Sequence, residues 1–124
     1  MTPHARQHLG ATGEQLAAEH LKRRGFAIVE RNYRTRWGEL DIIAFDGHTL
    51  AFCEVKSRRV AGRAGAPFDA LGPGKQGRVR RMAGRWLAER RPRPHADQIR
   101  FDAIGVTFDA AGRLVSLDHL EGAF

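Results

Sequence analysis

Cysteine is nearly absent from this chain of 124 residues, and long apolar runs are missing. The one cysteine, Cys53, excludes a disulfide framework and a zinc site built from several thiolates, and it fits a reducing cytoplasmic setting. No run of about 18 apolar residues is present, and the first residues lack the pattern of a signal peptide. We therefore expect a cytoplasmic protein without a membrane partner, with residues 1–124 forming a single domain.

Acidic residues are outnumbered by basic ones. The chain has 21 Lys and Arg against 14 Asp and Glu, a formal net charge of +7. A basic surface attracts phosphates whatever the base sequence, so the charge favours a nucleic acid as partner. Only three of the basic residues are lysines, namely Lys22, Lys56 and Lys75. The others are arginines, and coding bias is another source of an arginine-rich composition. Charge alone therefore does not establish the partner.

The strongest local pattern is a β-hairpin. Two apolar-rich stretches, residues 39–45 and 49–57, flank the dipeptide Asp46-Gly47. Asp-Gly between apolar runs is a strong hairpin signal, and its loop length sets the pairing of the two strands. Two loop lengths, of two or of four residues, remain open.

Four charged side chains lie on this hairpin. Successive strand residues point to opposite faces, so Glu39 and Asp41 share one face, as do Glu54 and Lys56. Either even loop length puts all four on the same face: a two-residue loop sets Asp41 diagonal to Glu54, and a four-residue loop sets it directly opposite. A three-residue loop would separate the carboxylates. Carboxylates this close repel each other, so the hairpin predicts a divalent cation between them.

The remaining segments complete an α/β order. Gly25 is the predicted C-terminal cap of the first helix, and Pro92 and Pro94 end the second. Apolar residues at helical spacing define that second helix. The predicted elements are a helix at 11–24, a strand at 26–30, the hairpin strands, a helix that contains Val79 to Leu87, and strands at 99–108 and 113–120.

Two acidic residues outside the hairpin have two interpretations each. Glu14 lies on the apolar stripe of the first helix, about 20° from Leu21. It either reaches water from the edge of that stripe or points inward to join the hairpin acids. Asp102 lies on an apolar face of its strand, where a cap or an arginine pair is favoured over catalysis.

Basic residues gather in two connections and on the second helix. Residues 31–38 form a basic aromatic connection that either contacts phosphates and stacks bases on Tyr33 or Trp37, or packs on the core. Residues 58–74 form a long basic loop. Lys75 lies one turn before Val79, so its amine can reach a site beneath the helix. The candidate nucleic-acid contacts are Lys75, Arg34, Arg36, Arg58, Arg59 and Arg78.

The Glu-x-Lys triplet alone is not specific, because chance gives roughly 0.4 such triplets in a chain of this length. Together with the preceding strand and helix, however, it resembles the PD-(D/E)xK nuclease superfamily, which includes Holliday-junction resolvases. More narrowly, the chain is similar to the YraN-like family of small bacterial predicted endonucleases. The segments that carry the resemblance are Gly13-Glu14, Arg31-Asn32-Tyr33-Arg34, residues 38–44, residues 52–58, Lys75, Phe101-Asp102 and Gly122-Ala123-Phe124.

The resemblance implies a restriction-endonuclease-like core, a central mixed β-sheet flanked by helices. It implies that Asp41 and Glu54 hold a metal together with the carbonyl of Val55, and that Lys56 is the catalytic partner. Glu14 matches a supporting helix glutamate, and Glu39 is an accessory acid. Mg²⁺ or Mn²⁺ suits such oxygen ligands, because both are hard cations.

These observations predict a metal-dependent nuclease that acts on DNA phosphodiester bonds, with branched or processed DNA as a candidate substrate and a homodimer as a candidate assembly. Two alternatives stay open. One is a catalytically inactive nucleic-acid-binding module of the same fold. The other is a small ribosome-associated RNA-binding protein, in which Glu14, Asp41, Glu54 and Lys56 would be coincidental.

Overall fold

The computed structural model describes the backbone of residues 3–60 and 73–124 and the side chains of residues 12–60 and 74–124. Within these ranges neither helix is long and apolar enough to cross a bilayer. The elements follow the predicted α-β-β-β-α-β-β order: α1 (Pro3–Arg23), β1 (Ala27–Thr35), β2 (Gly38–Phe45), β3 (Thr49–Arg59), α2 (Pro73–Glu89), β4 (Gln98–Phe108) and β5 (Leu114–Leu120).

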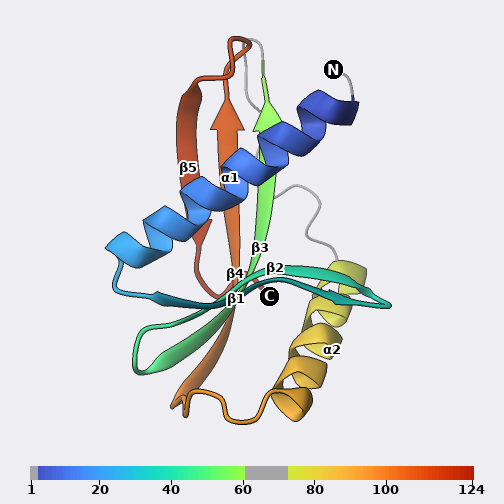
Figure 1. Cartoon of the computed structure of the whole chain (residues 1–124), viewed down its shortest axis with the longest axis vertical. Helices are drawn as coiled ribbons and strands as arrows, with labels where there is room; N and C mark the ends of the chain where they lie inside the picture. The colour runs from blue at the N-terminus through green and yellow to red at the C-terminus, as the bar shows by residue number, and fades with distance from the viewer. Residues whose placement is uncertain (1–2, 61–72) are drawn as a thin grey trace.

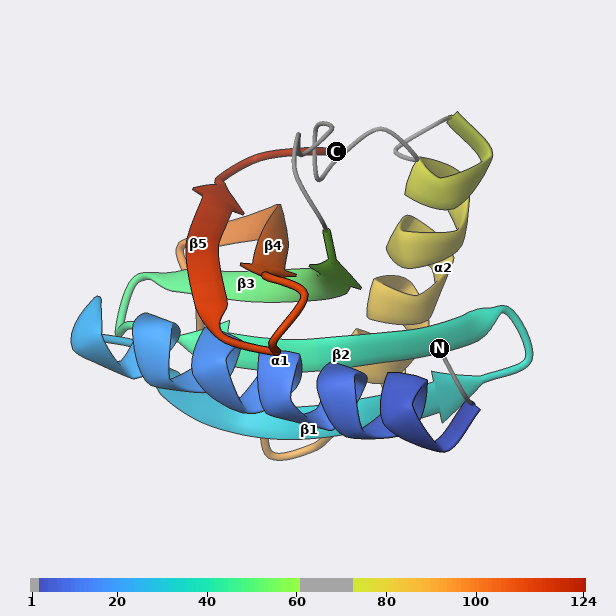
Figure 2. The same cartoon turned by 90° about the horizontal axis from the view of Figure 1, so that it is seen from above.

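The strands form one mixed sheet in the order β1-β2-β3-β4-β5. Only β3 and β4 are parallel, because the crossover that contains α2 returns the chain in the same direction. Figures 1 and 2 show that the sheet twists strongly. In Figure 1, β1 and β2 run across the direction of β3, β4 and β5. The predicted α/β class with a mixed sheet is confirmed.

The two helices cover opposite faces of the sheet and enclose separate apolar clusters. Strand alternation sends neighbouring residues to opposite clusters, so Phe52 packs under α2 while Cys53 is buried under α1. The burial expected for Cys53 is confirmed. On the α2 side, Trp86 lies edge-on to Phe52, with ring centroids 5.7 Å apart.

The hairpin between β2 and β3 has a four-residue loop. Phe45 pairs with Leu50, which leaves residues 46–49 as the connection. The Asp46 carboxylate holds this loop by accepting hydrogen bonds from the backbone N–H groups of His48 and Thr49 at 2.9 and 2.6 Å. The two-residue alternative is wrong, and the pairing of β2 with β3 runs from Phe45 to Ile42 and stops before Asp41.

Several predicted boundaries are wrong. Helix α1 begins at Pro3 instead of residue 11, and β1 continues to Thr35, where a connection was expected. Pairing with β2 supplies the backbone hydrogen bonds of this polar stretch, so its lack of apolar alternation did not matter. Strand β3 also extends to Arg59, into the expected loop 58–74. Residues 61–72 of that loop lie outside the described residues.

Polar contacts anchor α2 against β1. The Glu30 carboxylate accepts one hydrogen bond from Trp86 Nε1 at 2.9 Å and two from the Arg90 guanidinium at 2.8 Å. The Tyr33 hydroxyl donates to Glu89 at 2.9 Å. These bonds fix the helix over the sheet and so determine which side chains its first turn presents to β3.

Asp102 is fully buried in a network of its own. Arg100 donates two hydrogen bonds to its carboxylate at 2.8 and 2.9 Å, and the ring of His119 lies at 2.8 Å. Burial raises the pKa of Asp102, but these bonds and one from the Gly122 N–H outweigh it and hold the pKa below its ordinary value. The predicted arginine pair is confirmed.

Helix α1 packs closely on β3 at Gly13, and the chain turns out of the helix at Gly25, two residues after Arg23. At the C-terminus, Gly25 has a φ of 91°, and Phe26 N–H donates to the Leu21 carbonyl at 2.9 Å, which confirms the predicted glycine cap. Gly13 is buried against β3, where an added Cβ would lie 1.7 Å from Ser57 Oγ and 3.0 Å from Ser57 Cβ. Only glycine permits this close approach of α1 to β3.

We expect Gly13→Ala to lower the free energy of unfolding by about 1 to 3 kcal/mol, because the methyl group must push α1 away from Ser57. Gly84→Ala in α2 is the matched control. A Cβ at position 84 meets nothing within 4 Å, so alanine there raises stability by about 0.5 to 1 kcal/mol through its higher helix propensity. Urea unfolding of both variants measures the two changes in the free energy of unfolding, which should have opposite signs. If Gly13→Ala stabilised the protein as much as Gly84→Ala does, the close contact at Gly13 would be contradicted.

Candidate metal centre

Asp41 lies at the centre of the acidic site, on β2. Its neighbour Ile42 pairs with Cys53 at the end of the β2–β3 ladder, so Asp41 lies just past the last paired residues, where Glu54 follows Cys53. The Asp41 carboxylate accepts a hydrogen bond of 2.7 Å from the backbone N–H of Val55. This bond turns the carboxylate along β3 and holds it in one orientation.

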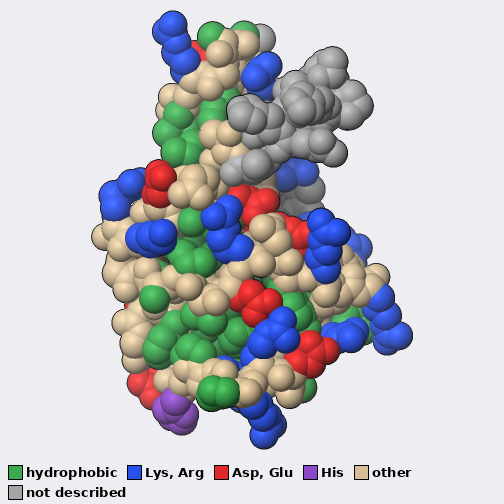
Figure 3. Space-filling model, viewed as in Figure 1, with side chains coloured by type: hydrophobic (Ala, Val, Ile, Leu, Met, Phe, Trp, Pro, Cys, Tyr) green, Lys and Arg blue, Asp and Glu red, His purple; other side chains and the backbone are tan. Residues whose placement is uncertain are grey.

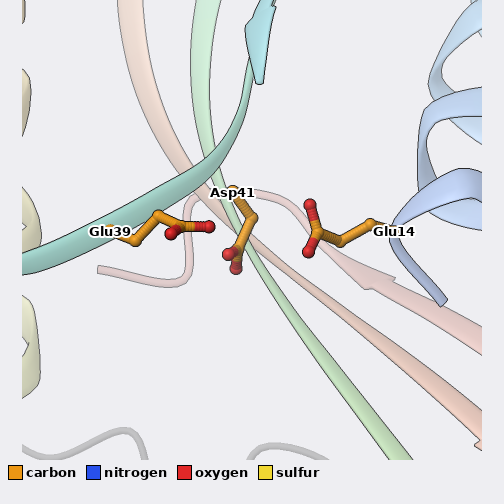
Figure 4. A group of neighbouring side chains, drawn as sticks. All are labelled: Glu14, Glu39 and Asp41. Atoms are coloured by element: carbon orange, nitrogen blue, oxygen red, sulfur yellow. The ribbon is translucent and has the colours of Figure 1, made fainter. Parts of the chain in front are cut away.

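Two further acids face Asp41. Ligand oxygens of Glu14, Glu39 and Asp41 all lie within 4.8 Å of one another. Figure 4 shows the Asp41 carboxylate between Glu39 of β2 on one side and Glu14 of α1 on the other. Of the two interpretations of Glu14, the structure therefore supports the inward one, and Gly13 explains it because the close helix contact brings the next residue over β2.

Asn32 joins this group, and its role was missed in the sequence. With its amide nitrogen turned toward the acids, it donates to Glu14 at 2.8 Å and to Glu39 at 2.7 Å. Its φ of 55° lies in the left-handed region, which asparagine tolerates better than most residues. An asparagine inside a polar strand was the available signal.

Strand β2 breaks its alternation at the site. Leu40 is buried in the cluster under α2, whereas Ile42 is buried in the cluster under α1. Residues two apart normally share a face, so the strand rotates locally at Asp41. The partner strand does the same at Asn32, which lies between Arg31 and Tyr33, the residues that pair with Ile42 and Leu40. This paired irregularity gathers acids from two faces.

The environment of Asp41 disfavours its charged form. Burial raises its pKa most, the Val55 N–H bond lowers it, and the negative charges of Glu54, Glu14 and Glu39 raise it further, to about 7. Burial also raises the pKa of Glu14. The positive charge of Arg31, whose Nη2 lies 4.0 Å from Glu14 Oε1, lowers this pKa but does not cancel the effect of burial. The group therefore carries more negative charge than its own cations balance.

Glu54 stands apart from the three clustered acids. Its carboxylate makes an ion pair of 3.2 Å with Lys75 Nζ in the first turn of α2. Both residues, with Glu39 and Arg78, line a cavity of about 410 Å³ between the β1–β2 turn and α2. The expectation that the Lys75 amine reaches the site beneath α2 is borne out by this contact.

Lys56 follows Glu54 by two positions on β3 and is exposed. It makes no ion pair with any described residue. The remaining predicted ligand, Val55, contributes its N–H to Asp41. The structure thus brings Asp41, Glu14 and Glu39 together, leaves Glu54 outside this group in an ion pair with Lys75, and exposes Lys56 on β3.

The predicted nucleic-acid contacts do not form one patch, since Lys75 and Arg78 line the cavity whereas Arg59 lies near Gly112 in the β4–β5 turn. Figure 3 shows Lys and Arg side chains interspersed with Asp and Glu on the face it views. Of the predicted contacts, Arg34 pairs with Glu39 at 3.1 Å, and the Arg36 guanidinium lies over the Trp37 ring, 4.7 Å from its centroid. Arg59 and Arg78 are exposed and Arg58 is partly buried.

The two aromatic residues of the 31–38 segment differ. Tyr33 is buried under α2 with 5% exposure, so it packs on the core and has no face for a base. Trp37 is partly buried and lines the cavity beside Glu39 and Glu54. Of the two interpretations of this segment, core packing is correct for Tyr33.

The acidic group suits a hard divalent cation. Oxygens that bind Mg²⁺ at about 2.1 Å lie about 3 Å apart when adjacent and about 4 Å apart when opposite. The 4.8 Å limit for the oxygens of Glu14, Glu39 and Asp41 requires only small side-chain movements. A raised Asp41 pKa is the expected signature of ligands held together before their cation binds. The donor set is all oxygen, the kind of ligand that hard divalent cations prefer.

Comparison with known proteins points to one family. A model of "Uncharacterised protein family UPF0102" matches residues 13–106. A UPF0102 protein of Frankia alni is 45% identical over the whole of both chains. One of Nocardia farcinica is 49% identical over 96% of this chain and 91% of its own length. One of Geobacter metallireducens is 41% identical, covering 94% of this chain and 91% of its own.

The raised pKa of Asp41 predicts a pH-dependent stability. The unfolded chain releases this proton near pH 4 and the folded protein near pH 7, so stability falls as pH rises between these values. Asn keeps an oxygen for the Val55 N–H but carries no charge. Since one pKa unit is about 1.4 kcal/mol, Asp41→Asn raises the free energy of unfolding at pH 8 by about 2 to 4 kcal/mol in EDTA.

Urea unfolding at pH 5 and pH 8 measures this difference, which should be smaller at pH 5. Exposed Asp118 supplies the control, because Asp118→Asn leaves stability unchanged at both pH values. A stability gain for Asp41→Asn that is equal at pH 5 and pH 8 would contradict the assignment.

Proposed function

The chain belongs to the UPF0102 family, and we propose that it is a metal-dependent nuclease that hydrolyses DNA phosphodiester bonds. The observation that carries the proposal is the convergence of Glu14, Glu39 and Asp41 within 4.8 Å around a carboxylate with a raised pKa. Burial and the neighbouring negative charges disfavour the charged form of Asp41, which has no ion pair among the described residues. A cation site is the simplest reason for a fold to retain this arrangement.

The fold supports the proposal. A helix that delivers an acid, an antiparallel hairpin that carries Asp41 and Glu54, and a parallel strand after a crossover helix match the expected restriction-endonuclease-like core. In that interpretation the chain belongs to the PD-(D/E)xK superfamily. The net charge of +7 favours a polyanionic substrate.

Each residue has a distinct role in this proposal. Asp41 binds the cation, Glu14 and Glu39 complete or support its oxygen ligands, and Glu54 joins them from across the strand pair. The cation lowers the pKa of water and neutralises charge on the phosphate. The Lys56 ammonium, exposed two residues after Glu54, stabilises negative charge that develops on the phosphate oxygens. Lys75 and Arg78 hold a neighbouring phosphate at the cavity.

One observation favours a binding module as the second candidate. Glu54 is paired with Lys75 instead of lying with the other acids. A protein that only binds nucleic acid would keep this ion pair and the basic surface without turnover. The two candidates differ in whether phosphodiester bonds are broken.

The test is cleavage of single-stranded, duplex, flapped and branched DNA with Mg²⁺, Mn²⁺ or EDTA. We expect activity that requires the divalent cation. Asp41→Asn and Lys56→Met each reduce the rate by about 100-fold or more, because each removes a group that acts on the transition state. Asp118→Asn and Lys22→Met, both at exposed positions away from the site, are the matched controls.

Cleavage that persists in both Asp41→Asn and Lys56→Met would point to a contaminant and reject the assigned site. Cation-dependent DNA binding without cleavage of any substrate would favour the binding module. Mn²⁺-independent binding of RNA that Asp41→Asn leaves unchanged would favour the RNA-binding alternative.

A further inference from the structure

We propose that Lys75 is the counter-ion of Glu54 until a divalent cation displaces it, and that the released ammonium then binds a phosphate of the nucleic acid. Cation and nucleic acid would therefore bind cooperatively. The inference deepens the proposed function and rests on it, because it takes the acidic site as the cation site.

The ion pair has the geometry of an exchangeable contact. Lys75 Nζ lies 3.2 Å from Glu54 Oε2, with side chains 34% and 15% exposed. The carboxylate is the more buried partner, and the ammonium lies at the solvent side in the first turn of α2. Both line the cavity of about 410 Å³, which is open to a ligand between α2 and the β1–β2 turn.

The balance of charge at the site assigns Lys75 its role. Of the three clustered acids and their neighbour Glu54, three residues have a cation: Arg31 lies 4.0 Å from Glu14, Arg34 lies 3.1 Å from Glu39, and Lys75 pairs with Glu54. Asp41 has no ion pair among the described residues. Glu54 follows Cys53, the partner of Ile42, and its negative charge raises the pKa of Asp41, so a divalent cation bound to Asp41 would attract the Glu54 carboxylate as well.

Competition at Glu54 follows from this arrangement. A divalent cation attracts the carboxylate more strongly than an ammonium does and repels the Lys75 charge. Once Glu54 binds the cation, the ammonium loses its partner while remaining at the cavity. A phosphate oxygen is the complementary ligand there, and Arg78 on the same helix lines the cavity beside it.

Linkage makes the effect reciprocal. If the cation frees Lys75 for phosphate, then phosphate bound to Lys75 raises the affinity for the cation by the same factor. Without nucleic acid, Lys75 holds the cation affinity down. Removing its charge should therefore tighten cation binding, whereas a lysine that merely completes the site would weaken binding when removed.

The first experiment measures Mn²⁺ affinity by electron paramagnetic resonance in the absence of nucleic acid. We expect Lys75→Met to lower the dissociation constant by about 1.5- to fivefold, the range expected when a partly exposed ion pair no longer competes. Lys75→Gln is a second variant with the same expectation. Lys22→Met, which removes an exposed lysine from α1, should leave the constant unchanged. Unchanged or weaker Mn²⁺ binding in both Lys75 variants would overturn the proposal.

The second experiment measures binding of a fluorescent phosphorothioate duplex by anisotropy, in EDTA and in Mg²⁺ at matched ionic strength. Lys75→Met should weaken binding by about three- to tenfold in Mg²⁺ and by less than about twofold in EDTA, because only the cation releases the ammonium. Lys22→Met should behave alike in both conditions. An equal loss for Lys75→Met in EDTA and in Mg²⁺ would overturn the coupling.

The variant Asp41→Asn distinguishes a failure of the metal site from a failure of the exchange at Glu54. If it abolishes Mn²⁺ binding while the Lys75 variants bind Mn²⁺ as the wild type does, the metal site stands and the exchange at Glu54 fails. If Asp41→Asn leaves Mn²⁺ binding unchanged, the metal site itself fails, and the exchange fails with it.

Discussion

The close contact of α1 with β3 at Gly13 is the constraint on which the acidic site depends. A side chain at position 13 would hold the helix away from Ser57, and the next residue, Glu14, would then no longer reach Asp41. The contact also buries Ala17, Ala18 and Leu21 of α1 against the sheet. Burial of these apolar side chains thus supplies the free energy that holds the Glu14 carboxylate close to the carboxylates of Asp41 and Glu39.

The acidic site is held by fixed hydrogen bonds on its α1 side and by an ion pair that we propose is exchangeable on its α2 side. On the α1 side, Asn32 bridges Glu14 and Glu39, and the Val55 N–H fixes Asp41, so the oxygens are oriented by hydrogen bonds before any cation binds. On the α2 side, the ion pair that the described residues show is the partly exposed one of Glu54 and Lys75. Helix α2 is itself held to β1 by the contacts of Glu30 and Tyr33.

Local chemistry made much of the fold predictable. The Asp46-Gly47 turn, the Gly25 cap and the apolar spacing of α2 each depend on neighbouring residues, and each prediction was confirmed. The errors lie where distant pairing overrides local pattern. Residues 31–35 form part of β1 because β2 pairs with them, and Asn32 takes a left-handed conformation because the strands rotate there.

The sequence by itself determined the element order and the β2–β3 hairpin, though not the length of its loop, because turn residues and alternation act over a few positions. It left the orientation of Glu14 open and paired Asp41 with Glu54 as ligands. Only the tertiary structure decided that Glu14 and Glu39 gather around Asp41 while Lys75 neutralises Glu54. The reason is physical: helix docking and the local rotation of two strands arise from contacts between residues far apart in the chain, and no spacing within one segment encodes them.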